Sequence, residues 1–128
     1  MTAGHAAPRP RLRDRGQATV ELALGLPLVC LMLLGVLQVA LVVRHQLAVH
    51  AAARDGARAA AASADPGAAG AAALATTGLR PLTVTTSEHH GRVTVTVTYV
   101  DHTDAPLIGA LLPDVTLTAE VTMVIEPP

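Results

Sequence analysis

The hydrophobic residues of this chain follow three successive patterns. Residues 22–43 form an apolar run in which Gln38 is the one strongly polar side chain. Residues 44–65 are dominated by alanine, the best helix former, and contain no proline before Pro66. From residue 82 onward apolar and polar residues alternate, a period of two that predicts half-buried β-strands. The chain therefore predicts a long helix followed by a small sheet.

The apolar run is long enough to cross a bilayer. At about 1.5 Å per residue, a helix over residues 22–43 extends roughly 33 Å, against a hydrocarbon core of about 30 Å. A secretory signal sequence has a shorter apolar region of about 7–15 residues. A buried core helix is a poor explanation, because the rest of the chain is too small to surround it. We predict a transmembrane helix over residues 17–43, with the lipid bilayer as a partner.

Arginines flank the predicted span on both sides and bear on its orientation. The group before the span is denser than the group after it, and no folded domain precedes it. Because basic loops favour the cytoplasmic side, we predict a single-pass protein of the cell membrane with a cytoplasmic N-terminus and an extracytoplasmic C-terminal domain. Residues 1–16 are assigned to a basic leader, of which about the first fifteen are predicted to be disordered. The arginines are Arg9, Arg11, Arg13 and Arg15 before the span and Arg44, Arg54 and Arg58 after it.

The helical pattern continues beyond the span. We predict one helix from about residue 18 to residue 62, ended by Asp65-Pro66-Gly67. Gly56 weakens this helix by about 1 kcal/mol. A further alanine-rich turn or two is expected over residues 68–75. Residues 44–80 are accordingly assigned to an extracytoplasmic helix extension and linker.

Three alternating segments predict an antiparallel sheet over residues 81–128. The sequence His89-His90-Gly91 supplies a hairpin turn, and a longer connection with Pro106 and Pro113 precedes the third strand. Three strands with one apolar face need a cover, and the alanine-rich helix is the candidate. The predicted fold class is α+β: a long N-terminal transmembrane helix that extends into a small three-stranded antiparallel sheet. The strand segments are residues 82–85, 93–99 and 115–125.

Composition narrows the function classes. The chain has 9 basic and 10 acidic residues, whereas a nucleic-acid-binding protein needs a basic surface. Cys30 is the single cysteine, which excludes an internal disulfide and a CxxC motif. No nucleophile motif, phosphate-binding glycine loop or paired carboxylates are evident. We therefore predict no enzymatic activity, no cofactor, no small-molecule substrate and no nucleic-acid partner.

The histidines do not predict a metal site. His89 and His90 are adjacent, and neighbouring strand residues point to opposite faces. His45 and His50 do not have a same-face helical spacing. No three ligands converge as a zinc site requires, so we interpret these residues as turn and surface histidines.

The functional signal lies ahead of the span, where residues 13–21 read RDRGQATVE. A basic leader, a glycine, and a glutamate five residues later at the head of a membrane helix resemble the processing site of type IV pilins and pseudopilins. The runs RGQATVELALGLP and AARDGARAAA resemble the TadE-like family of minor pseudopilins from tight-adherence pilus systems. The resemblance covers about residues 15–61.

This resemblance implies a pilin-like fold and a structural role in pilus assembly. It implies that a membrane-embedded prepilin peptidase cuts after Gly16 and leaves Gln17 as the new N-terminus. The partners that it implies are the prepilin peptidase, other pilin or pseudopilin subunits and the assembly platform. Gln17 is less apolar than the residue that commonly follows the cut in major pilins.

Two residues of the apolar helix have both an implied role and a simpler physical explanation. The resemblance implies that Glu21 pairs with the free α-amino group of Gln17 in a neighbouring subunit and sets the helix register. A carboxylate at a helix start is also favoured by the helix dipole. Pro27 removes the hydrogen bond to the carbonyl of Ala23 and is predicted to bend the helix, although membrane helices also tolerate proline without such a role.

Charged and small residues supply two candidate contact surfaces. Arg54, Asp55 and Arg58 lie on the helix extension, where Asp55 can pair with Arg58 three residues later. They form either a contact face for another pilin or the assembly platform, or a solvated stripe. Small side chains in the span offer surfaces for helix contact. They are Gly25, Cys30, Gly35 and Ala40.

Two other functions stay open. One is an unprocessed, single-span anchored protein whose small exported domain binds a partner. It differs from the pseudopilin in one bond, because it keeps Met1 or Thr2 where cleavage would expose Gln17. The other is a membrane-anchored hydrolase, which would need a pocket with converging polar groups.

Overall fold

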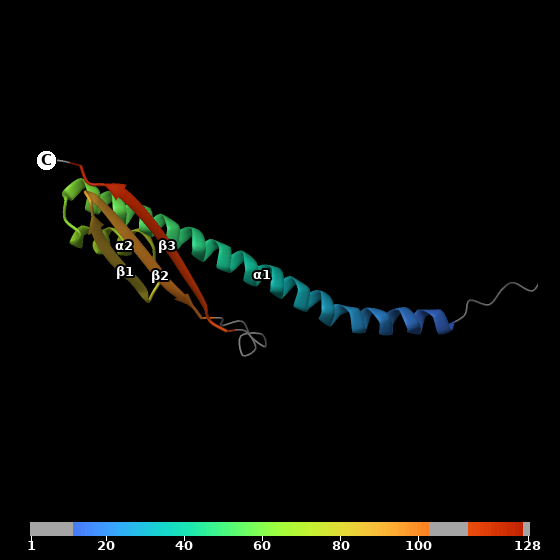
Figure 1. The fold of residues 1–128 in the computed structure, drawn as a ribbon. Coiled ribbons are helices and arrows are strands. Elements are labelled where there is room, and N and C mark those ends of the chain that lie inside the picture. Colours follow the sequence, from blue (N-terminus) through green and yellow to red (C-terminus); the bar gives the residue numbers. More distant parts are fainter. Residues whose placement is uncertain (1–11, 103–112, 127–128) are drawn as a thin grey trace, which may run out of the picture. The chain divides into compact units, whose positions relative to one another are not determined.

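The computed structural model describes residues 12–102 and 113–126. It contains two helices followed by three strands (Figure 1), which confirms the predicted α+β class. The chain divides into two units between Leu37 and Gln38, and each unit is described by itself. In chain order the elements are α1 (Leu12–Ser63), α2 (Gly67–Thr76), β1 (Leu82–His89), β2 (Arg92–Asp101) and β3 (Val115–Val124).

Helix α1 begins at Leu12, ahead of the predicted start near residue 18. Residues 12–15, predicted to be disordered, are therefore helical. No proline separates Leu12 from residue 18, and one glycine, Gly16, weakens a helix by about 1 kcal/mol without stopping it. The prediction for residues 1–11 lies outside the described residues.

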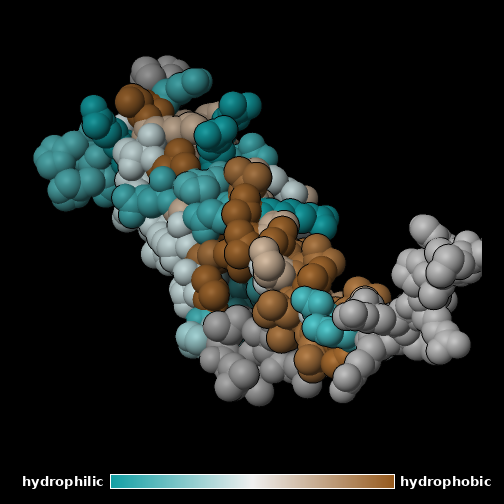
Figure 2. Space-filling view, turned by 90° about the vertical axis from the view of Figure 1, so that its right-hand side faces the viewer, coloured by the Kyte–Doolittle hydropathy of each residue, from teal (hydrophilic) through white to brown (hydrophobic). Residues whose placement is uncertain are grey.

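In the first unit, the apolar side chains of α1 are uncovered. Leu24 is 75% exposed and Met32 70% exposed. In the most apolar stretch of 18 residues in α1, no residue is buried. Figure 2 shows brown, hydrophobic residues exposed on the surface beside teal and pale ones. Within the described residues, α1 is the one helix with the length and composition to cross a membrane, as the apolar run predicts.

In the second unit, the strands form an antiparallel sheet of order β1-β2-β3. The turn between β1 and β2 contains His90 and Gly91, whose φ angles are 50° and 71°. Two successive positive φ angles are what a two-residue type I′ hairpin requires, so the predicted turn is confirmed. Pro113 precedes β3, whereas Pro106 in the same connection lies outside the described residues.

The buried core of the second unit consists of helix alanines packed with strand valines. Alanine side chains are short, so the helices approach the sheet closely, and a chain with one aromatic residue still forms a core. The prediction that the alanine-rich helix covers the sheet is confirmed, and α2 contributes to the same cover. The core comprises Val49, Ala52, Ala53, Ala57, Ala60 and Ala61 of α1, Ala69 and Ala73 of α2, and Val93, Val95, Val97, Leu117 and Ala119 of the sheet.

Helices α1 and α2 and strand β2 approach one another closely at Gly56. A Cβ atom added to Gly56 would lie 3.0 Å from the carbonyl oxygen of Ala69 and 3.3 Å from Cγ1 of Val95. Carbon atoms in good contact are about 3.5–4.0 Å apart. Gly56 therefore weakens α1 locally but permits α1, α2 and β2 to meet at one point.

Candidate functional site

The predicted processing site lies near the start of α1. Gly16, Gln17 and Glu21 are all exposed. Gly16 is inside the helix, and a Cβ atom added to it would meet nothing within 4 Å. Gln17 and Glu21 are four residues apart and so share one face of the helix.

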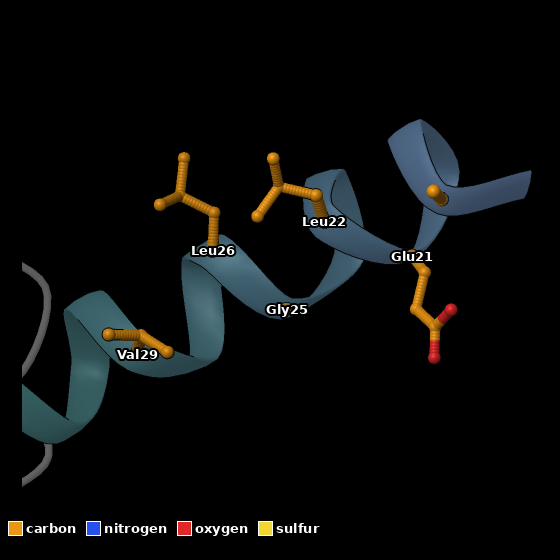
Figure 3. A pocket seen from close by; sticks show the side chains of 6 residues that line it. Glu21, Leu22, Gly25, Leu26 and Val29 are labelled. Carbon is orange, nitrogen blue, oxygen red and sulfur yellow. The ribbon is translucent and has the colours of Figure 1, made fainter. Parts of the chain in front are cut away.

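A shallow groove runs along this part of α1 (Figure 3). The side chains of Leu22 and Leu26 stand on one side of the helix, and the carboxylate of Glu21 extends away from them. Gly25 lies between Leu22 and Leu26 in the chain and has no side chain, so the backbone is uncovered there. The result is an apolar helix surface with one carboxylate at its end. Its lining residues are Ala18, Glu21, Leu22, Gly25, Leu26 and Val29.

The glycines of α1 differ in what surrounds them. A Cβ atom at Gly25 or Gly35 would meet nothing within 4 Å, whereas one at Gly56 would be crowded from two elements. No contact among the described residues therefore requires glycine at positions 25 and 35. Pro27 lies inside α1, which continues through it, and the bend there stays a prediction. The thiol of Cys30 is free and exposed.

The charged triplet of α1 is arranged differently from the predicted i, i+3 pair. Arg54, Asp55 and Arg58 are exposed. Oδ2 of Asp55 accepts a hydrogen bond of 2.9 Å from the hydroxyl of Thr76, at the end of α2. No ion pair between Asp55 and Arg58 is present in the described part of the chain. Asp55 thus links the two helices, and Arg54 and Arg58 remain as exposed cations.

Three of the four histidines follow their interpretation as turn or surface residues, because His50, His89 and His90 are exposed. The interpretation is wrong for His45. Its side chain is only 24% exposed, and its Nδ1 lies 2.8 Å from Oδ2 of Asp101, a side chain that is 11% exposed. Among the described residues, no group of three histidine, cysteine or acidic side chains could hold a metal ion.

The aromatic ring of Tyr99 completes this arrangement. It meets the ring of His45 edge-on, with 5.7 Å between the ring centroids. Asp101 and Tyr99 both come from the end of β2, and His45 comes from α1. The cluster of His45, Tyr99 and Asp101, which we call the His45 cluster, therefore ties α1 to the sheet.

Sequence reasoning missed the His45 cluster because its members are far apart in the chain. A signal was nevertheless present. In β2 the buried positions are Val93, Val95 and Val97, and the same alternation reaches Asp101. A carboxylate at a core-facing position is costly without a partner, so Asp101 required a donor from the covering helix.

Comparison with known proteins bears on the N-terminal half. Residues 16–58 match the family model of TadE-like protein. The match covers about a third of the chain and begins at Gly16. It confirms the resemblance found from the RGQATVELALGLP and AARDGARAAA runs. No match was found among curated proteins or among solved structures.

The match lies on one element of the fold. TadE-like proteins are non-enzymatic pseudopilins associated with Tad pili. The TadE-like segment, residues 16–58, lies entirely on α1. It includes the exposed apolar part of that helix and continues to Arg58. The similarity to TadE-like proteins therefore lies on the membrane-length N-terminal helix.

Proposed function

We propose that this protein is a minor pseudopilin that acts in the assembly of a tight-adherence pilus. The observation that carries the proposal is that the TadE-like match begins at Gly16, at the head of an exposed, membrane-length apolar helix. In this proposal α1 is inserted with its N-terminus in the cytoplasm, and the part of the chain that follows Val43 lies outside. The denser arginine group before the span supports that orientation.

Cleavage after Gly16 by a prepilin peptidase is the first step of the proposed function. Gly16 lies within α1, so the backbone around it must unwind to enter a protease cleft. Glycine is about 1 kcal/mol less favourable than alanine in a helix, which lowers the cost of unwinding at this residue. A Cβ atom added to Gly16 would meet nothing within 4 Å, so Gly16 itself lies in open space.

Cleavage would place a positive charge close to Glu21. The new α-amino group of Gln17 and the carboxylate of Glu21 lie four residues apart in one chain. In a filament, the α-amino group of one subunit can face the Glu21 carboxylate of the next subunit. Two charges that pair within an apolar assembly avoid the cost of isolated charges in lipid. The apolar groove beside Glu21 is proposed to receive a helix of that subunit.

The part of α1 beyond the span offers a second contact surface. Arg54 and Arg58 are exposed and one helical turn apart. We propose that they contact another pilin subunit or the assembly platform. Asp55 contributes indirectly, because its bond with Thr76 holds α2 beside this part of α1.

The N-terminus of the mature chain tests the processing step. Intact-mass and N-terminal peptide analysis would be made on the protein from its native membrane. The wild-type chain is expected to begin at Gln17, and the full-length form should accumulate in Gly16→Ala and in a strain without prepilin peptidase. Gly25→Ala is the matched control, because it changes an equally open glycine of the same helix and should leave processing intact.

Retention of residues before Gln17 in the wild-type strain would refute the pseudopilin mechanism. The alternative function would then stand: an unprocessed single-span protein with a small exported domain that binds a partner. If cleavage is found, Glu21→Gln tests the register role separately. The variant should be cut normally but be depleted from the sheared pilus fraction.

A further inference from the structure

A cavity in the second unit lies next to the His45 cluster and has no role in the proposed processing or assembly. Its volume is about 290 Å³, and it opens between α1 and the segment that joins α2 to β1. Helix α1 supplies one wall, and the connecting segment supplies the other. The lining residues are Arg44, His45, Ala48, Thr77, Gly78 and Leu79.

Two side chains at this cavity, Arg44 and Thr77, can donate hydrogen bonds. Arg44 is exposed and forms no ion pair with any described carboxylate. The hydroxyl oxygen of Thr77 accepts a hydrogen bond of 3.2 Å from the backbone N–H of Leu79, which leaves the hydroxyl hydrogen for another acceptor. A guanidinium beside a hydroxyl donor suits an anion with several oxygens, and arginine binds phosphate through paired N–H groups.

The imidazole ring of His45, which also lines the cavity, is held in place. Nδ1 of His45 is bonded to Asp101, which is not among the lining residues. The edge contact with Tyr99 fixes the ring further. The ring is thus a preorganised part of the wall, and the carboxylate of Asp101 is already engaged with it.

The position of the cavity along α1 indicates where its ligand comes from. The apolar run ends at Val43, and the next residue is Arg44. At about 1.5 Å per residue, Ala48 lies roughly 7.5 Å beyond Val43 along the helix. The headgroup layer on each side of a bilayer is about 5–8 Å thick. A helix inserted over the apolar run therefore places this cavity in the layer that contains lipid phosphates.

We infer that the cavity lined by Arg44, His45 and Thr77 binds the phosphate of an anionic phospholipid headgroup. The inference rests on the membrane insertion of α1, which belongs to the proposed function, but not on cleavage or pilus assembly. Its chemistry, a phosphate group held by an arginine and a hydroxyl donor, is shared with inorganic phosphate. The two sources are distinguished by experiment.

Lipid retention by the full-length protein tests the inference. The protein would be reconstituted in nanodiscs of phosphatidylcholine with a minor fraction of phosphatidylglycerol, then extracted and examined by native mass spectrometry. We expect the wild type to retain one phosphatidylglycerol in preference to phosphatidylcholine. Arg44→Gln should lower this retention by about tenfold, because a charge-assisted contact is lost.

Two further variants separate the cavity from general charge effects. Arg92→Gln removes an exposed arginine of the second unit that does not line the cavity, so it should retain phosphatidylglycerol as the wild type does. Gly78→Leu keeps every charge but adds a side chain where a Cβ atom meets nothing within 4 Å. It should fill the cavity and lower retention, with the circular dichroism spectrum unchanged.

Each result has a defined meaning. Equal retention by wild type and Arg44→Gln would overturn the inference while leaving the pseudopilin function untouched. Competition by inorganic phosphate, titrated onto the detergent-solubilised protein at physiological concentration, would assign the cavity to free phosphate and overturn its assignment to a lipid. Failure of the wild type to enter nanodiscs would contradict the membrane insertion on which both proposals rest.

Discussion

Replacing Gly56 by alanine tests whether close packing of α1 on α2 and β2 holds the second unit together. The added methyl group would lie 3.0 Å from the carbonyl oxygen of Ala69 and 3.3 Å from Cγ1 of Val95. Neither neighbour can turn away cheaply. The oxygen belongs to the backbone of α2, and Val95 is fully buried, so α2 or β2 must shift.

The expected effect is the difference between two opposing contributions. Overpacking of a dense core costs about 1–3 kcal/mol, and exchanging glycine for alanine within a helix returns about 1 kcal/mol. Gly56→Ala should therefore destabilise the second unit by up to about 2 kcal/mol. Gly70→Ala is the matched control, because a Cβ atom at Gly70 of α2 meets nothing within 4 Å. It should stabilise the unit by up to about 1 kcal/mol.

The measurement is thermal unfolding of the full-length variants in detergent, followed by the fluorescence of Tyr99. Tyr99 is the only aromatic residue and lies in the sheet, so its signal reports on the second unit. For a domain of this size, about 1 kcal/mol shifts the unfolding temperature by roughly 4–8 °C. The two variants should therefore shift the temperature in opposite directions. If Gly56→Ala raises it as Gly70→Ala does, the packing argument is wrong.

Two further predictions concern the His45 cluster and the hairpin turn. His45→Ala should destabilise the second unit by about 1–3 kcal/mol, since it leaves the carboxylate of Asp101 buried without its partner. A double-mutant cycle with Asp101→Asn measures this coupling by denaturant unfolding, and additive effects would show that the bond contributes nothing. In the turn, Gly91→Ala should cost about 1–2 kcal/mol because Gly91 has a φ of 71°. His90→Asn, at a φ of 50°, should be neutral or stabilising in the same assay; a clear loss of stability relative to the wild type would contradict a type I′ turn.

Local patterns along the chain were sufficient for the elements and their order. A change from an unbroken apolar run to alanine-rich sequence and then to alternation separates α1 from the three strands. Each of these signals depends only on near neighbours in the chain, where helix and strand periods act. The processing signal at Gly16 and Glu21 is local as well, which is why the family resemblance could be found from residues 15–61.

The start of α1 was harder to place for a related reason. The leader is rich in arginine and proline and has no apolar period, so residues 12–15 were assigned to the disordered part. The terminal turn of a helix forms mainly because it continues a stable helix, and it does not need a hydrophobic period of its own. The strong helix beyond residue 18 therefore extends back to Leu12.

The amino-acid sequence by itself determined a membrane-length helix, an alanine-rich extension and a covered three-stranded sheet, because periodicity and propensity are properties of neighbouring residues. Only the tertiary structure decided which isolated residues meet. It brought His45 to Asp101 across 56 positions of the chain, Asp55 to Thr76, and Gly56 against α2 and β2. These contacts depend on how α1 lies on the sheet. That geometry is set by the summed packing of many small side chains, so it cannot be predicted from any short stretch of sequence.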